Sequence, residues 1–569
     1  MQYLRTPRAV ELLAVDSTSQ NFPRRVIASV FATVPVQPLR DPTRVVAVSL
    51  PALRLISSNA EALVKDSEFA KVYSGGSVSG WGHCYWGTQF GNYAGQLGDG
   101  AAMLIGESTE TGFELNLKGS GKTTFSRGFD GRKVTRSSVR EFLCSEFMAG
   151  AGVPTTRAGS IILSETSKVM RDVNYSGRPI EENCAVISRI AKTFFRFGSF
   201  ESDALEDSQS IKALTKYCWE HLVKPLAKNP AESFMDVVID RTAETVALWQ
   251  ALGFTHGVMN TDNMSIIGDT IDYGPFGFVE TYDPHFVPNT SDKFGRYAFS
   301  EQPRMAAWNL QRFSDSIALH VGETEAHECG WKRLEGIESQ FFARFRHFYD
   351  RQMRMKLGLI AAPENDFIRI RDQILELMDF SAVDFTVTFR ALSDLTPDSV
   401  ETVLDRIMTT FPPPERVVRL ASANLRVSRQ DIPEIEEFAR SRPQDLERAG
   451  ISRHAVVHWK HKLDRIDRFS GEEAQVCEEA KGRWKLVLND LATYLDHDSR
   501  AIMKTVNPVY IPRQALIQMA IEKLEANGDP SEVEKLLAMF LEPYKETPGC
   551  EEYEKPDLTN FGVTLSCSS

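Results

Sequence analysis

The chain has 569 residues, of which 42% are hydrophobic and 25% charged, a balance typical of globular proteins rather than of disordered chains or coiled coils. Lys and Arg number 65 against 77 Asp and Glu, so the net charge is −12, whereas a general nucleic-acid surface is basic. No stretch approaches the roughly 18 apolar residues of a membrane span. We therefore expect no nucleic-acid partner and no membrane span.

Strand signals come first along the chain and helix signals follow. Residues 113–117 alternate apolar and polar side chains, as in a half-buried strand, and 134–150 has helical periodicity. An apolar stripe runs along 234–252 and Gly253 stops it, while three prolines at 412–414 indicate a linker. The predicted fold is α+β, with four parts: a leader or flexible arm (1–20), a strand-rich lobe (21–204), a helical lobe (205–411) and a helical C-terminal extension (412–569).

The segment 256–274 has the residue types of a metal-dependent transfer site. Asp262 and Asn263 are followed by Asp272-Tyr273-Gly274, and carboxylate and amide oxygens suit Mg²⁺, which takes its other ligands from phosphates and water. Helix, acidic loop and then Asp-aromatic-Gly is the order found in a protein-kinase C-lobe. The alternative is two Asp-rich surface turns, because Asp and Asn favour turns.

A second segment suggests a nucleotide-orienting ion pair. Lys118 ends the alternating strand and Glu141 lies on the helix after it, the order in which kinases pair a strand Lys with a helix Glu. The alternative is a solvent-facing Lys and a surface Glu with helical i,i+4 partners.

Glycines and arginines add weaker signals for phosphate binding. The run 119–124 resembles the tail of a P-loop, but Asn116 stands where that motif needs a glycine, so a P-loop NTPase is disfavoured. Gly98 and Gly100 belong to a glycine cluster that lets backbone amides approach a phosphate or simply makes a hairpin turn. Arg189 and Arg196 suit a phosphate clamp or a strand edge.

The eight cysteines are scattered, with no CxxC pair and no metal-site spacing, which does not support a disulfide framework. Cys567, in the tail Cys567-Ser568-Ser569, is the exception that we consider for a redox role. Our hypothesis is a reversible disulfide with Cys550, and the alternative is a frayed tail.

Several motifs in order along the chain resemble those of the selenoprotein O family, kinase-like enzymes that transfer AMP to proteins. They are YWGTQFGNYAGQLGDG (85–100), LKGSGKTTFSRGFDGR (117–132), RSSVREFLCSEFM (136–148), PTTRAG (154–159), ISRIAKTFFRFGSFE (187–201) and HGVMNTDNMSIIGDTIDYGPFGF (256–278). The resemblance implies a bilobal protein-kinase-like fold that binds ATP in a flipped orientation, with the α-phosphate facing the acceptor.

The resemblance also implies residue roles. Asp262 matches the proton acceptor, Asn263 and Asp272 match the Mg²⁺ ligands, with Mn²⁺ as an alternative metal, and Glu141 matches the partner that positions Lys118. The nucleotide-binding positions of the family are matched by Gly98, Gly100, Lys118, Asp130, Gly131, Arg189 and Arg196.

Two departures from the family pattern are Ala101, where Arg is usual, and Phe194-Phe195, where the family is more polar. The expected function is transfer of AMP from ATP to Ser, Thr or Tyr hydroxyls of proteins, with release of pyrophosphate. A kinase transferring the γ-phosphate and a non-catalytic, nucleotide-binding pseudokinase are the alternatives. Eukaryotic relatives imply mitochondria, in line with Arg5 and Arg8 in an acid-free start, and bacterial relatives imply the cytoplasm.

Overall fold

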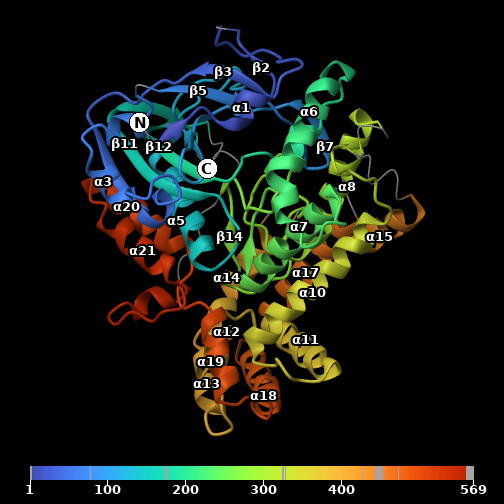
Figure 1. Cartoon of the computed structure of the whole chain (residues 1–569). Coiled ribbons are helices and arrows are strands. Elements are labelled where there is room, and N and C mark those ends of the chain that lie inside the picture. Colours follow the sequence, from blue (N-terminus) through green and yellow to red (C-terminus); the bar gives the residue numbers. More distant parts are fainter. Residues whose placement is uncertain are drawn as a thin grey trace.

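The computed structural model has a strand-rich lobe and a large helical region, and its elements are labelled in Figure 1. The predicted α+β class is confirmed. The structure describes residues 3–558 apart from 19, 77, 173–176, 323–325, 327, 424, 426, 443–452 and 472. Cys567 lies outside the described residues, so its redox role stays a prediction. Within the described ranges no helix has both the length and the hydropathy needed to cross a bilayer.

The strand-rich lobe is built on one mixed sheet. Its strands follow the order β2-β3-β5-β8-β9-β12-β11-β4, with β1 added to β8 and β10 added to β12. The strands are β1 (Leu4–Arg5), β2 (Val15–Asp16), β3 (Phe31–Pro35), β4 (Thr43–Val48), β5 (Ser79–His83), β8 (Ala102–Ser108), β9 (Glu114–Lys118), β10 (Lys133–Val134), β11 (Arg157–Arg171) and β12 (Ile180–Ala191). A separate hairpin pairs β6 (Trp86–Gln89) with β7 (Asn92–Gln96). The helices here are α1 (Arg8–Leu12), α2 (Leu50–Leu53), α3 (Ala60–Lys65), α4 (Phe69–Tyr73) and α5 (Thr135–Gly150).

Helices make up most of the rest. They are α6 (Ser208–Cys218), α7 (Phe234–Leu252), α8 (Gln302–His320), α10 (Ile337–Leu357), α11 (Glu364–Ser381), α12 (Phe385–Leu392), α13 (Val400–Met408), α14 (Pro414–Ser422), α15 (Ile432–Ser441), α17 (Arg453–Phe469), α18 (Glu473–Ala492), α19 (His497–Val506), α20 (Gln514–Asn527) and α21 (Ser531–Leu541). The only strands there among the described residues are β13 (Phe254–Thr255) and β14 (Gly277–Phe278). As predicted, Gly253 ends α7, and it does so in the left-handed conformation.

The first described residues of the chain belong to the sheet and its core. β1 pairs with β8, and Ala9 and Leu13 are buried in the main core. Glu107 holds this segment by an ion pair with Arg5 and by accepting a hydrogen bond from the backbone N–H of Arg8 at 2.8 Å. The predicted division at residue 20, like the other part boundaries, stays a prediction.

The last two helices return to the first lobe. Figure 1 shows α20 and α21, in red, beside α5. The rings of Phe147 and Phe540 meet edge to face at 5.7 Å, and Gly150 fits against the backbone carbonyl of Phe540, where a β-carbon would lie 2.3 Å away. The C-terminal extension therefore supports the helix that carries Glu141.

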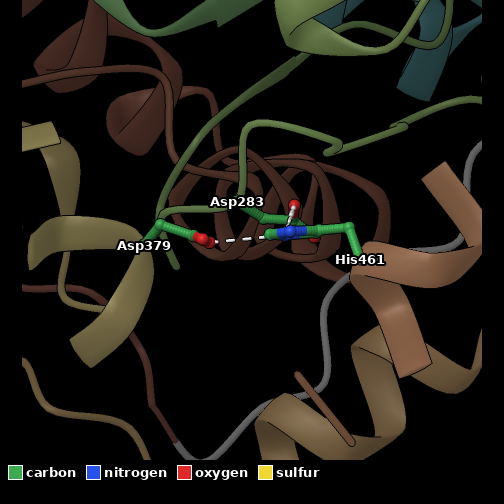
Figure 2. A group of neighbouring side chains, drawn as sticks. All are labelled: Asp283, Asp379 and His461. Carbon is green, nitrogen blue, oxygen red and sulfur yellow. Dashed lines mark ion pairs between the residues drawn. The ribbon is translucent and has the colours of Figure 1, made fainter. Parts of the chain in front are cut away.

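A cluster of charged groups joins the segment after the Asp272 loop to the C-terminal helices. Figure 2 shows Asp283, Asp379 of α11 and His461 of α17, with the His461 Nε2 atom 3.3 Å from a carboxylate oxygen of each Asp. Arg465 also pairs with Asp379, at 2.6 Å. Burial lowers the pKa of His461, but the two carboxylates outweigh it and raise this pKa to about 9. His461 is therefore an imidazolium at neutral pH, and the residues of the cluster balance one another's charge.

We expect His461→Gln to destabilise the protein by about 2 kcal/mol near pH 6.5, since two partly buried carboxylates lose one of their cations. The folded-state pKa of His461 lies above its unfolded value, so its contribution is complete below about pH 6.5 and is lost as the pH rises through about 9. Denaturant unfolding of both proteins from pH 6 to pH 9.5 measures this difference. A difference that is constant over this range would contradict the assignment.

Candidate active site

The strand lysine and the helix glutamate lie in contact. Lys118 ends β9 near the middle of the sheet, with Ile187 of β12 opposite, and its Nζ atom lies 2.9 Å from Oε2 of Glu141 on α5. Both side chains are buried, at 10% and 7% exposed. The structure thus brings together the two residues predicted to form the ion pair.

Arg189 and Asp272 complete a network of four charges with this pair. Opposite residues of antiparallel strands share a face, so Arg189, two residues after Ile187, lies on the same face as Lys118. Arg189 contacts Glu141 and places its Nη2 atom 2.7 Å from Oδ1 of Asp272, while Lys118 Nζ lies 2.5 Å from the same oxygen. Two cations therefore face two carboxylates.

The network keeps both carboxylates ionised. Burial raises the pKa of Asp272, but Lys118, Arg189 and Arg196 outweigh it and hold this pKa well below its usual range. Burial also raises the pKa of Glu141, and Arg189 and Lys118 outweigh it. Asp272 adopts a left-handed backbone with φ of 64°, which is uncommon for a residue with a side chain. Its carboxylate is one-third exposed and thus reachable by a ligand.

Asp262 lies in a different environment on a short 3-10 turn, Thr261–Asn263. Its side chain is buried, accepts a hydrogen bond from Gln89 Nε2 at 3.2 Å, and makes no ion pair among the described residues. Burial raises the pKa of Asp262 to about 7, against the lowering effects of Arg196 and Gln89. A carboxylate with this pKa can accept a proton near neutral pH.

A close backbone approach fixes the position of the Asp262 carboxylate. Gly87 of β6 lies directly against it, and a β-carbon on Gly87 would fall 2.5 Å from Oδ1 of Asp262. The same β-carbon would lie 2.7 Å from Leu97. Only a glycine fits between these two side chains.

Arg196 supports the Asp262 loop rather than the Lys118 network. Its Nη1 atom donates to the backbone carbonyl of Asp262 at 3.0 Å, and its guanidinium lies 4.4 Å from the centre of the Tyr85 ring. The predicted arginine pair therefore divides: Arg189 contacts Asp272, and Arg196 contacts the chain at Asp262. Burial lowers the pKa of Arg196, but Tyr85, Asp99 and Asp272 outweigh it, so Arg196 stays charged.

The remaining predicted nucleotide positions lie on the turn before β8 and on the segment between β9 and β10. Gly98 has a left-handed φ of 64° and packs against Phe125, and Gly100 approaches the same residue. Gly131, with φ of 69°, packs against the backbone of Gly121. Asp130 accepts hydrogen bonds from Arg171 at 2.7 and 2.8 Å, so the structure places it in an ion pair with Arg171, which is not part of the Lys118 network.

The two predicted metal ligands fit a hard divalent cation. Asn263 donates from Nδ2 to the carbonyl of Val258 at 3.0 Å, and its Oδ1 atom is buried without a hydrogen-bond partner in the described structure. A buried oxygen without a partner is costly unless a ligand occupies it. Lys118 and Arg189 both contact Oδ1 of Asp272, and none of the hydrogen bonds in the described ranges uses its Oδ2. These two oxygens suit Mg²⁺ or Mn²⁺.

The residues that the sequence reasoning missed are those of the β6–β7 hairpin. Gly87 and Gln89 belong to a motif, residues 85–100, that carried the family resemblance but received no role of its own. Glu201 was missed as well, and it accepts hydrogen bonds from Thr261 and Thr88 at 2.8 and 3.2 Å, linking the hairpin to the Asp262 turn.

A strand Lys paired with a helix Glu, followed by acidic loops in a helical region, defines a kinase-like ATP-dependent transferase. The family model described as "Protein adenylyltransferase SelO" matches residues 29–541. The human relative named "Protein adenylyltransferase SelO, mitochondrial" is 39% identical over 94% of this chain and 86% of its own. "Protein nucleotidyltransferase YdiU" of Flavobacterium johnsoniae is 35% identical over 98% of each chain.

The chain belongs to the protein adenylyltransferase SelO family. The predicted family, the kinase-like α+β fold and the prediction of an adenylyltransferase enzyme are confirmed at this level. The human, mouse and zebrafish relatives carry "mitochondrial" in their names and the bacterial ones do not, so the predicted location stays a prediction.

We expect Gly87→Ala to reduce AMP transfer at least tenfold, because its β-carbon would displace the Asp262 carboxylate or Leu97. Overpacking should lower stability by only about 1–3 kcal/mol. Gly128→Ala is the matched control, since a β-carbon there meets nothing within 4 Å. Initial rates with α-labelled ATP and melting curves test this, and near-normal transfer by Gly87→Ala would contradict the placement of Asp262.

Proposed function

We propose that this chain transfers AMP from ATP to Ser, Thr or Tyr hydroxyls of proteins and releases pyrophosphate, with Asp262 as the proton acceptor. The observation that carries the proposal is the contrast between two nearby carboxylates. Asp272 is held ionised by Lys118 and Arg189, while Asp262 is buried with only a neutral donor, Gln89, on its side chain. Family membership supplies the reaction class.

In the proposed reaction the acceptor O–H gives its proton to an oxygen of Asp262 as the hydroxyl oxygen bonds to the α-phosphorus. The bond from this phosphorus to the oxygen that bridges to the β-phosphate breaks, and the electron pair leaves with pyrophosphate. Lys118 and Arg189 would offset phosphate charge from fixed positions, which requires no reorganisation during the reaction. Glycine turns at Gly98 and Gly100 would admit phosphate oxygens close to backbone amides.

Asn263 and Asp272 would hold Mg²⁺, or Mn²⁺ as the alternative. A bound divalent metal would supply positive charge next to the phosphates. This assignment is supported by the unpartnered Oδ1 atom of Asn263 and by the second oxygen of Asp272.

For location we propose mitochondria, with the cytoplasm as the alternative, and imaging of the tagged full chain decides between them.

We expect label from α-labelled ATP, and none from γ-labelled ATP, to appear on the protein itself or on an added acceptor. Asp262→Asn should reduce this labelling at least a hundredfold, since general-base catalysis contributes about 10²–10⁴-fold. ATP binding, measured by calorimetry, should stay within a few-fold of normal. Labelling only from γ-labelled ATP would establish a kinase, and ATP binding without any labelling would establish a scaffold.

We expect EDTA to stop the transfer and added Mg²⁺ or Mn²⁺ to restore it. Asn263→Ala should raise the metal concentration for half-maximal rate at least tenfold, because one oxygen ligand is lost. Asp272→Asn should raise it further, since the charged ligand is lost and Lys118 and Arg189 lose their shared anion. Unchanged metal dependence in both variants would show that other residues bind the metal.

A further inference from the structure

A cavity of about 380 Å³ lies beside the glycine-rich turn, and the site described above does not use it. Four separate parts of the described chain form its walls: residues 23–25, the β6–β7 hairpin with its continuation to Leu97, the loop 124–127, and Asp203. Hydrogen bonds hold the first wall to the third, because Thr124 donates to the carbonyl of Phe22 at 3.0 Å and accepts from the backbone N–H of Arg24 at 3.3 Å.

The lining of this cavity is basic in an acidic protein. Arg24, Arg25 and Arg127 line it together with one acid, Asp203, although the chain as a whole has a net charge of −12. Arg25 and Arg127 are exposed, so they offer their charges to an incoming group. A concave basic surface concentrates anions and attracts them from a distance.

Arg24 gives an independent indication of a ligand. One of its terminal nitrogens pairs with Asp16, but Nε and Nη2 are buried and have no hydrogen-bond partner in the described part of the chain. Buried donors of a charged group are costly to leave unpaired. An anion in the cavity would provide the missing acceptors.

The cavity is close to the proton acceptor. Leu97 lines the cavity. Its side chain and the Asp262 carboxylate lie close together beside Gly87, since both are within 3 Å of the point that a β-carbon of Gly87 would occupy. The cations assigned to the nucleotide, Lys118 and Arg189, do not line it. A polypeptide that presents a hydroxyl to Asp262 would therefore place neighbouring residues at the cavity.

We propose that this cavity binds an acidic side chain, a carboxylate or a phosphate, of the acceptor protein close to the hydroxyl that is modified. The proposal rests on the function proposed above, because it deepens the choice of acceptor in that reaction. Arg25 and Arg127 select the acceptor by charge, and Arg24, which also lines the cavity and keeps buried donors unpaired, adds to the positive charge. The phosphates of the nucleotide are the other source of such an anion, and the test separates the two.

The first measurement is binding, which needs no turnover. A fluorescein-labelled peptide with one Tyr among six Glu residues is titrated with the full chain and followed by anisotropy, beside a peptide with Gln in place of Glu. We expect the Glu peptide to bind at least tenfold tighter, and salt to weaken it. The double variant Arg25→Glu, Arg127→Glu should abolish the preference. Arg440→Glu, an exposed charge reversal on α15, is the matched control and should keep it.

The second measurement is transfer of AMP to the same peptides from α-labelled ATP. The double variant should raise the KM for the Glu peptide at least tenfold, with kcat and the KM for ATP unchanged. An increase in the KM for ATP alone would assign the cavity to the nucleotide and overturn the proposal. Equal binding of the Glu and Gln peptides would overturn it too. If the wild type binds ATP but labels nothing, the proposed reaction fails, and the binding measurement still decides whether the cavity takes acidic peptides.

Discussion

Glu141 is a buried carboxylate that forms ion pairs with two cations, Lys118 and Arg189. Lys118 and Arg189 are both nearly inaccessible to water, and each contacts it. An ionised group in such a place is tolerated only with its partners in position, and removal of one partner typically costs about 3–5 kcal/mol. The position of α5, which carries Glu141, therefore determines whether Lys118 and Arg189 face Asp272 correctly.

This requirement explains why the end of the chain lies against its first lobe. The helices α20 and α21 both pack on α5. Phe540 of α21 meets Phe147 of α5, and Arg140 of α5 hydrogen-bonds Gln514 at the start of α20. In turn, Gln514 donates to the carbonyl of Phe276, just beyond the Asp272 loop, at 3.0 Å. The C-terminal helices thus connect the helix that holds Glu141 with the loop that holds Asp272, and both sides of the ion network share one support.

Local patterns in the sequence were sufficient for some of this site and insufficient for the rest. Lys118 and Glu141 could be predicted to meet, because a Lys that ends a strand and a Glu on the helix after it stand in the order in which kinases form this ion pair. The contact of Gly87 with Asp262 and the hydrogen bond from Gln89 join residues far apart in the chain, and no periodicity encodes them. The pairing of Asp130 with Arg171 could not be predicted from local patterns either, because Arg171 reaches Asp130 only through the long hairpin that β11 and β12 form. Arg196 had the right charge for a phosphate clamp, but its contacts with Tyr85 and the Asp262 backbone depend on the tertiary fold.

The balance between positive and negative groups around the site bears on how a nucleotide could be bound. Lys133 lies near Lys118. The charge of Lys118, together with burial, lowers the pKa of Lys133 to about 8, so the carboxylates nearby do not fully balance the positive charge at this point. Asp272 compensates part of this charge through a single oxygen, Oδ1, which both Lys118 and Arg189 contact. Phosphate oxygens entering the site would add acceptors for the same two cations, while the Oδ2 atom of Asp272 and the Oδ1 atom of Asn263 remain for a metal. Lys133 and Arg196 add positive charge beyond the four groups of this network, and that charge would offset what remains on the triphosphate once a divalent metal is bound.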